Sequence, residues 1–147
     1  MRKLAMGLAA WCLVAASHAA ESEYPNRPIR FIVPYVAGGA ADIFTRTVGQ
    51  KLTEAWGQTV VVDNRAGANG GIGTELAAKS PADGYTLLLG NSGPITVNPV
   101  LYRKTAYDPI EDLAPITQGT SYSYVLVVPA SGTVTTLKDF IALLKSK

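Results

Sequence analysis

The residues with the clearest chemical potential form a run of small side chains between an apolar segment and an amphipathic one. Ala37, Gly38, Gly39 and Ala40 leave their peptide groups accessible, and a helical pattern begins close to Asp42. The first N–H groups of a helix have no partner within the helix, and the helix dipole makes them attractive to anions. This order of residues favours half of a binding site for a small anion, although the glycines could equally serve a tight turn.

Two further loops of small residues carry polar side chains that could complete such a site. Residues 64–71 contain Gly67 and Arg65, whose guanidinium can pair with a carboxylate through two hydrogen bonds. The third loop contains Asn91 and Ser92, which can donate hydrogen bonds. The alternatives are a solvated loop arginine and ordinary turn chemistry.

Two residues at the edges of the first loop also have two interpretations each. Asp42 could contact an amine or hydroxyl of a ligand, but an acid in the first turn of a helix more often caps it. Tyr35 is either a wall of the pocket or a packing residue. The predicted ligand-binding set is Tyr35, Ala37, Gly38, Gly39, Ala40, Asp42, Arg65, Gly67, Asn91 and Ser92.

Residues 1–20 have the pattern of a secretory signal peptide. Two basic residues precede an apolar run over 4–16 that is too short to span a bilayer, and small residues suited to cleavage stand at Ala19 and Ala20. Cleavage leaves 11 acidic residues balanced by as many basic ones, so charge gives no reason to expect a nucleic-acid partner. We expect a periplasmic protein, because the exported part has no cysteine for disulfides.

The only cysteine, Cys12, and the only histidine, His18, lie within this leader. The exported part therefore offers no disulfide, no thiolate nucleophile, no Ser-His-Asp triad and no zinc site built on Cys or His. We predict no catalysis, no metal and no cofactor. The competing hypothesis is a periplasmic hydrolase using Ser92 or Asp42, whose base would have to be a carboxylate or a lysine. The glycine spacings of dinucleotide and triphosphate loops are absent.

The elements that must position these loops are short apolar runs typical of buried strands. The runs cover 29–33, 58–63 and 85–89, and helical patterns follow the first two runs over 43–56 and 72–79. Apolar strands that alternate with helices predict an α/β fold with a largely parallel sheet, in which ligands bind beyond the carboxyl ends of the strands. Later elements are expected as strands at 114–117 and 124–128 and as helices at 97–102 and 137–144.

Longer motifs extend from the first strand almost to the end of the chain. They are Pro25-x-x-Pro28-Ile29-x-x-Ile32-Val33-Pro34, Gly38-Gly39-x-x-Asp42, Gly57-Gln58-x-Val60-Val61-Val62-x-Asn64-Arg65, Asp83-Gly84-Tyr85-Thr86-Leu87-Leu88 and Asn98-Pro99-x-Leu101-Tyr102. Together they resemble the opening of the Bug-type solute-binding proteins, the periplasmic receptors of tripartite tricarboxylate transporters. The likeness runs from about Tyr24 to the end.

This resemblance implies two lobes of the type II periplasmic-binding-protein fold that close on a small carboxylate held by loop amides and bridging waters. It also implies transporter subunits in the membrane, or a sensor, as partners. Because members of the family are longer, we expect a signal peptide at 1–20, a first lobe at 21–120 and an incomplete second lobe at 121–147. The alternative is a non-functional, truncated remnant of such a receptor.

Overall fold

The structure, a computed structural model, describes residues 23–132 and 134–146. The chain divides after Ala114 into a first unit and a second unit that begins at Pro115. The predicted signal peptide lies outside the described residues. Within the described ranges, no helix combines the length and apolar character needed to cross a membrane.

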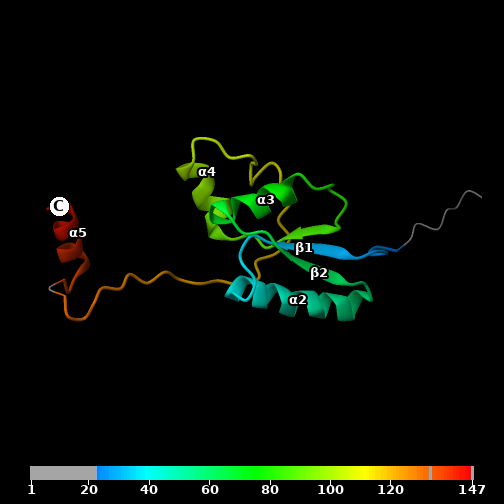
Figure 1. Cartoon of the computed structure of the whole chain (residues 1–147), viewed down its shortest axis with the longest axis horizontal. Coiled ribbons are helices and arrows are strands. Elements are labelled where there is room, and N and C mark those ends of the chain that lie inside the picture. Colours follow the sequence, from blue (N-terminus) through cyan, green and yellow to red (C-terminus); the bar gives the residue numbers. More distant parts are fainter. Residues whose placement is uncertain (1–22, 133, 147) are drawn as a thin grey trace, which may run out of the picture. The chain divides into compact units, whose positions relative to one another are not determined.

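The sheet of the first unit forms around β1 (Ile29–Val33), the apolar run that two prolines bound. β2 (Val60–Asn64) pairs with one side of β1 and β3 (Thr86–Leu88) pairs with the other, so that the order is β2-β1-β3 (Figure 1). Both pairings are parallel. Ile29 and Ile32 have no exposed surface, because β1 is central in the sheet and helices contact it. The predicted α/β fold with a parallel sheet is confirmed.

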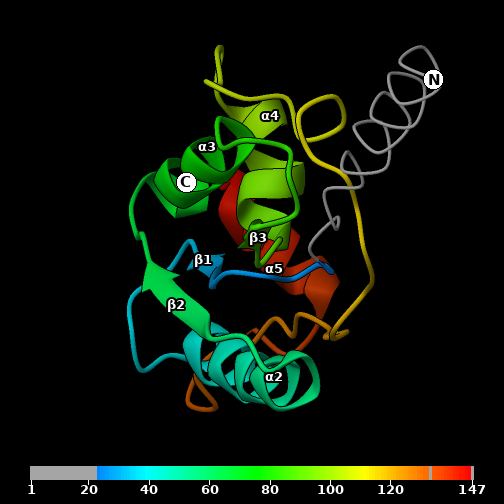
Figure 2. The ribbon, with the colours of Figure 1, turned by 90° about the vertical axis from the view of Figure 1, so that its right-hand side faces the viewer.

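α2 (Ala40–Trp56) packs against β1 and β2 on one side of the sheet (Figure 2). The packing is close at Gly49, where a Cβ atom would lie 3.2 Å from Val60. The sequence indicates an amphipathic helix here, but Ile43 is 60% exposed, so not all of its apolar residues face the sheet. The helix ends as predicted at Gly57, whose left-handed conformation lets its N–H bond the last turn.

α3 (Gly71–Ala78) packs against β1 and β3 on the opposite side of the sheet (Figure 2). The other helical segments of this unit are η1 (Ala68–Gly70), η2 (Gly93–Val97) and α4 (Asn98–Leu101). The helix predicted over 97–102 thus continues an earlier turn, because the N–H of Ile95 already donates to the carbonyl of Asn91 at 3.1 Å.

The segment before β1 is tied by side-chain contacts to the turn before β3. The hydroxyl of Tyr24 donates to the carbonyl of Gly84 at 2.7 Å. Arg27 pairs with Asp83 at 2.7 Å, and its guanidinium carbon lies 3.9 Å from the ring centre of Tyr85. These contacts fasten the chain at the amino ends of the strands, away from the small-residue loops.

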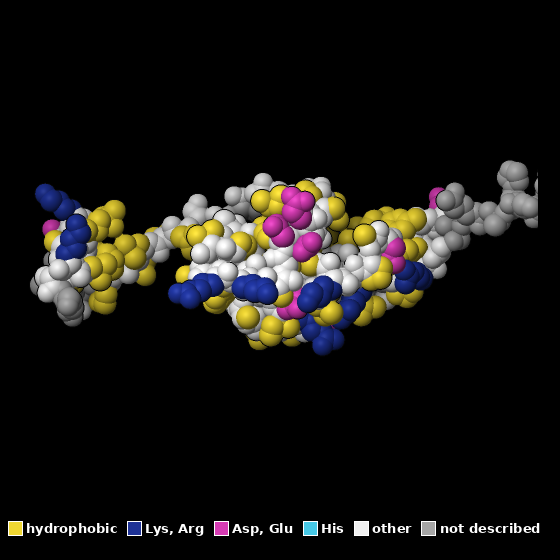
Figure 3. Space-filling view, turned by 90° about the horizontal axis from the view of Figure 1, so that it is seen from above, with side chains coloured by type: hydrophobic (Ala, Val, Ile, Leu, Met, Phe, Trp, Pro, Cys, Tyr) yellow, Lys and Arg dark blue, Asp and Glu magenta, His cyan; other side chains and the backbone are white. Residues whose placement is uncertain are grey.

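From residue 114 onward, and so throughout the second unit, the described residues form no strand, so the strands predicted at 114–117 and 124–128 are wrong. A strand needs a neighbouring strand to bond, and the described residues of this unit supply none. α5 (Leu137–Lys145) forms as predicted, and the hydroxyl oxygen of Thr136 caps it by accepting from the N–H of Asp139 at 3.2 Å. Hydrophobic side chains cover much of the visible surface of this unit (Figure 3, left).

Candidate ligand-binding site

The three small-residue loops lie at the same edge of the sheet, because parallel strands end on the same side. The N–H of Arg65 donates to the carbonyl of Val33 at 2.8 Å, which joins the second loop to the end of β1. The side-chain amide of Asn64 donates to the carbonyl of Tyr35 in the first loop at 3.1 Å. The third loop begins at Leu89, whose N–H also donates to β1. The predicted proximity of the loops is confirmed.

The first loop exposes its backbone at residues 37–40, where every residue is accessible to solvent. Gly38 has a φ of 83°, a left-handed conformation that favours glycine. Gly39 is different: its φ is −80°, and an added Cβ would meet only the carbonyl of Val36, at 3.7 Å. A larger residue at position 39 would therefore fit the fold while covering the exposed backbone.

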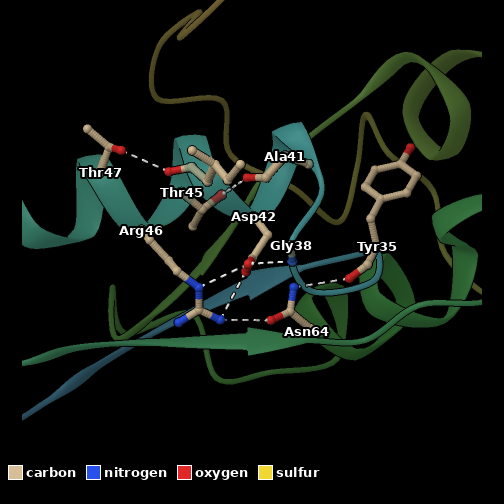
Figure 4. Close-up of polar contacts among 9 residues, drawn as sticks. Tyr35, Gly38, Ala41, Asp42, Thr45, Arg46, Thr47 and Asn64 are labelled. Carbon is tan, nitrogen blue, oxygen red and sulfur yellow. Dashed lines mark hydrogen bonds and ion pairs between the residues drawn. The ribbon is translucent and has the colours of Figure 1, made fainter.

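Asp42 holds the first loop against the start of α2 (Figure 4). Its carboxylate accepts from the N–H of Gly38 at 2.8 Å and from Nε of Arg46 at 3.0 Å. Nη2 of Arg46 lies 3.0 Å from the second carboxylate oxygen and donates to Asn64 at 3.2 Å. Since the side chain of Asn64 also bonds Tyr35, one network connects the first loop to β2.

The charge of this network lowers the pKa of Asp42. The hydrogen bond from Arg46, followed by that from the N–H of Gly38, lowers it from 3.8 to about 2, against the opposing effect of burial. Asp42 is only 3% exposed and its carboxylate is committed to the protein's own groups. This geometry favours a structural role in the first turn of α2 over direct contact with a ligand, but the N-cap residue is Gly39 and no side chain caps the helix, so Asp42 does not cap it, contrary to the prediction. The carboxylate also occupies the N–H of Gly38.

Sequence reasoning missed Arg46 and Asn64 in this network. The spacing of four residues between Asp42 and Arg46 is the signal that could have found the first, because residues four apart share one face of a helix. No sequence signal links Asn64 to Tyr35, since that contact depends on how the strands are ordered in the sheet.

Arg65 is engaged with an acidic neighbour that the prediction did not consider. Its Nε donates to Asp63 at 2.9 Å, and Arg30 donates to the other carboxylate oxygen at 2.7 Å. Burial by itself would raise the pKa of Asp63, but the hydrogen bonds from both arginines lower it. The Arg65 side chain stays half-exposed. It borders a shallow hollow of about 400 Å³ beside β2, whose wall includes Val61.

The second loop has an unusual backbone around Gly67. Gly67 and Gly70 have φ values of 130° and 84°, and Ala68 and Asn69 between them have 48° and 50°. An added Cβ at Gly67 would lie 2.5 Å from the side chain of Ile72. The glycine therefore serves a close contact within the loop as well as its conformation.

Asn91 and Ser92 lie just after β3, where the third loop turns into η2. The hydroxyl of Ser92 donates to the side-chain carbonyl of Asn91 at 3.1 Å. All ten predicted residues thus belong to the three loops or their borders, and their contact with a ligand stays a prediction. No cluster of three or more potential metal ligands occurs in the part of the chain that the structure describes.

A parallel α/β sheet with loops gathered at its carboxyl edge is an architecture in which ligands bind beyond the ends of the strands. The comparison with family models agrees: residues 44–147 match the tripartite tricarboxylate transporter family receptor, TctC. The chain belongs to this family, whose members are solute-binding receptors and not enzymes.

Individual relatives support the same assignment. Protein BugT of Bordetella pertussis is 42% identical over 91% of this chain. Among solved structures, the periplasmic binding protein BugD superposes with a TM-score of 0.58 at 39% identity, and the match covers 60% of this chain and 29% of BugD. An R. palustris protein solved with adipate gives a TM-score of 0.59 at 32% identity, over 85% of this chain and 42% of that protein. The chain spans 41% of the length of BugT.

Proposed function

We propose that this chain belongs to an extracytoplasmic receptor that captures a small organic carboxylate for uptake or sensing. The observation that carries the proposal is the exposed first loop, residues 37–40, at the carboxyl edge of the sheet and beside the second loop. Small residues there let a carboxylate approach backbone N–H groups. A relative of the same fold binds adipate, a dicarboxylate, which sets the class of ligand to test.

In this proposal the ligand is held mainly by backbone. Residues 37–40, Gly67 and the third loop with Asn91 and Ser92 surround the carboxylate, and Tyr35 forms a wall. The exposed part of the Arg65 guanidinium supplies positive charge, while Asp63 fixes its direction. Asp42 positions the first loop from within. The receptor acts in the periplasm with transporter subunits or a sensor. The site binds the carboxylate without changing it chemically.

The test replaces Gly39 with valine in the full chain carrying its leader. We expect Gly39→Val to fold, since the added Cβ meets no atom closer than 3.7 Å, and to lose binding because the branched side chain covers the loop. Adipate and malate are titrated by calorimetry into protein recovered from the periplasmic fraction. Ala55→Val is the matched control, an exposed position near the far end of the same helix.

Each outcome bears on the proposal. Binding by wild type and the Ala55→Val control, with loss in Gly39→Val, supports it. Equal affinity in all three proteins would contradict the proposal and indicate that the first loop is only a tight turn between strand and helix. No binding of either dicarboxylate by wild type would favour the non-functional remnant, an alternative consistent with the 41% coverage of BugT.

A further inference from the structure

The second loop holds two residues with side chains in the left-handed region, Ala68 with a φ of 48° and Asn69 with a φ of 50°. Asparagine enters this region more readily than other residues with a side chain, whereas alanine seldom does. Such residues persist only where the surrounding structure holds them. A neighbouring group must therefore hold Ala68 and Asn69 in this conformation.

Asn98, at the start of α4, is that group. It is 1% exposed, and its side-chain amide donates to the carbonyls of Ala68 at 3.2 Å and of Asn69 at 3.3 Å. Its side-chain oxygen accepts from the amide of Asn69 at 3.0 Å. One buried side chain from a distant part of the sequence thus makes three hydrogen bonds to the two left-handed residues.

The same contact joins the second loop to the segment after β3. A Cβ at Gly93 would lie 3.0 Å from the side-chain amide of Asn69, so the two loops pack without space for a larger residue. Pro94 follows and lies against Gly70, where a Cβ would meet its ring at 3.1 Å. The buried hydroxyl of Tyr107 donates to the carbonyl of Pro94 at 2.7 Å and braces this side.

We propose that Asn98 is a positioning residue for ligand binding: its side-chain amide holds the Gly67–Gly70 loop in its left-handed conformation. The inference rests on the proposed function, because it assumes that the second loop contacts a carboxylate. The competing interpretation is that Asn98 only adds stability to the fold as a whole. The two interpretations predict different effects when the amide donors are removed. A positioning role predicts faster hydrogen exchange in the loop alone, whereas a general stabilising role predicts faster exchange throughout the fold.

The test is Asn98→Asp, which keeps the size of the side chain and its oxygen acceptor but replaces the donors to Ala68 and Asn69. Amide hydrogen exchange in residues 66–72 should become about tenfold faster, the factor expected for the loss of such hydrogen bonds. The N–H of Leu89, bonded to β1, should exchange as in wild type. Uniformly faster exchange in the loop and in β1 would overturn the proposal.

A matched control removes a similar polar contact at the other end of the sheet. The hydroxyl of Thr53 donates to the carbonyl of Gly49 at 2.9 Å and accepts from the N–H of Val60 at 3.0 Å. Thr53→Val should therefore speed exchange near Val60 and leave the 66–72 loop unchanged. If Thr53→Val loosens the loop as much as Asn98→Asp does, the effect is global and Asn98 has no special role.

A second variant tests the same mechanism by relieving the backbone strain in the loop itself. Ala68→Gly in the same background should restore much of the loop's protection, because glycine adopts a φ near 48° without steric cost. The affinity of each variant for adipate is also measured, at a temperature well below that of unfolding. Asn98→Asp should weaken its affinity by about tenfold, and Ala68→Gly should recover part of it.

The two proposals fail in different ways. If adipate and malate do not bind wild type, the proposed function fails, while the exchange experiment still decides whether Asn98 holds the loop locally. If wild type binds adipate and the Asn98→Asp loop opens without any loss of affinity, the positioning role is wrong and the proposed function stands.

Discussion

Asp42 illustrates how the chemistry of one residue is assigned by its neighbours. A carboxylate next to a glycine loop could serve a ligand, but here it accepts from the N–H of Gly38 and pairs with Arg46. Its folded pKa of about 2 lies below the ordinary value of 3.8. Stability from this charge is therefore complete above the unfolded pKa and is lost as the pH falls through the folded one.

We expect Asp42→Asn to be less stable than wild type at neutral pH, with a difference that shrinks as the pH falls from about 5 to about 2. The neutral amide loses the ion pair with Arg46, whereas wild type loses it only on protonation. Urea unfolding followed by circular dichroism at several pH values measures the difference. Glu54→Gln, an exposed carboxylate in the same helix, is the control. A difference that is constant over this pH range would contradict the assigned pKa.

At the scale of elements, Gly73 lets α3 pack closely against the backbone at Arg65 and Pro34. A Cβ at Gly73 would lie 2.8 Å from the carbonyl oxygen of Arg65 and 2.8 Å from the Cα of Pro34. Both are backbone atoms, which cannot turn aside as a flexible side chain would. The helix that follows the second loop is thereby placed directly against the end of β1.

Gly73→Ala should therefore destabilise the protein by about 1–3 kcal/mol, the usual cost of forcing extra atoms into a packed contact. Gly71→Ala is the matched control in the same helix, because its Cβ would make only ordinary contacts of 3.5 Å. We expect its effect to lie within about 0.5 kcal/mol. Chemical unfolding of the two variants decides the matter, and equal midpoints would show that α3 can shift freely.

At the scale of the whole molecule, the second unit leaves apolar side chains in solvent. Val125 is 78% exposed and Val127 is 81% exposed, and α5 exposes Ile141 and Leu144 as well. Exposed apolar surface of this kind promotes association. Among the described residues of this unit, only α5 has regular structure.

We expect the full chain to self-associate as its concentration rises, and the double variant Val125→Lys/Val127→Lys to weaken this association by about tenfold or more. Sedimentation velocity over a concentration series measures it. Gln118→Lys/Thr120→Lys adds the same charge nearby without removing apolar side chains, and should have a smaller effect. If both double variants behave alike, net charge rather than exposed apolar surface controls association.

The amino-acid sequence by itself determined the framework of the first unit. The run Ile29–Val33 is apolar except for Arg30, which favours a strand covered on both faces, and such strands belong to parallel sheets. Parallel strands end at one edge, which also brought the three small-residue loops together as predicted. Local signals also mark one boundary of each of two helices: Gly57 follows the end of α2, and a threonine precedes the start of α5.

Only the tertiary structure decided which polar groups pair across the loops. Asn98 and Asn69 are far apart in sequence, and so are Asn64 and Tyr35, and no local pattern encodes such pairs. The strand predicted at 124–128 failed for the same reason, because an apolar, β-branched run becomes a strand only when a neighbouring strand accepts its hydrogen bonds. The spacing of apolar residues indicates which side of a segment can be buried. Hydrogen bonding between segments depends on which other segments the fold places beside each one.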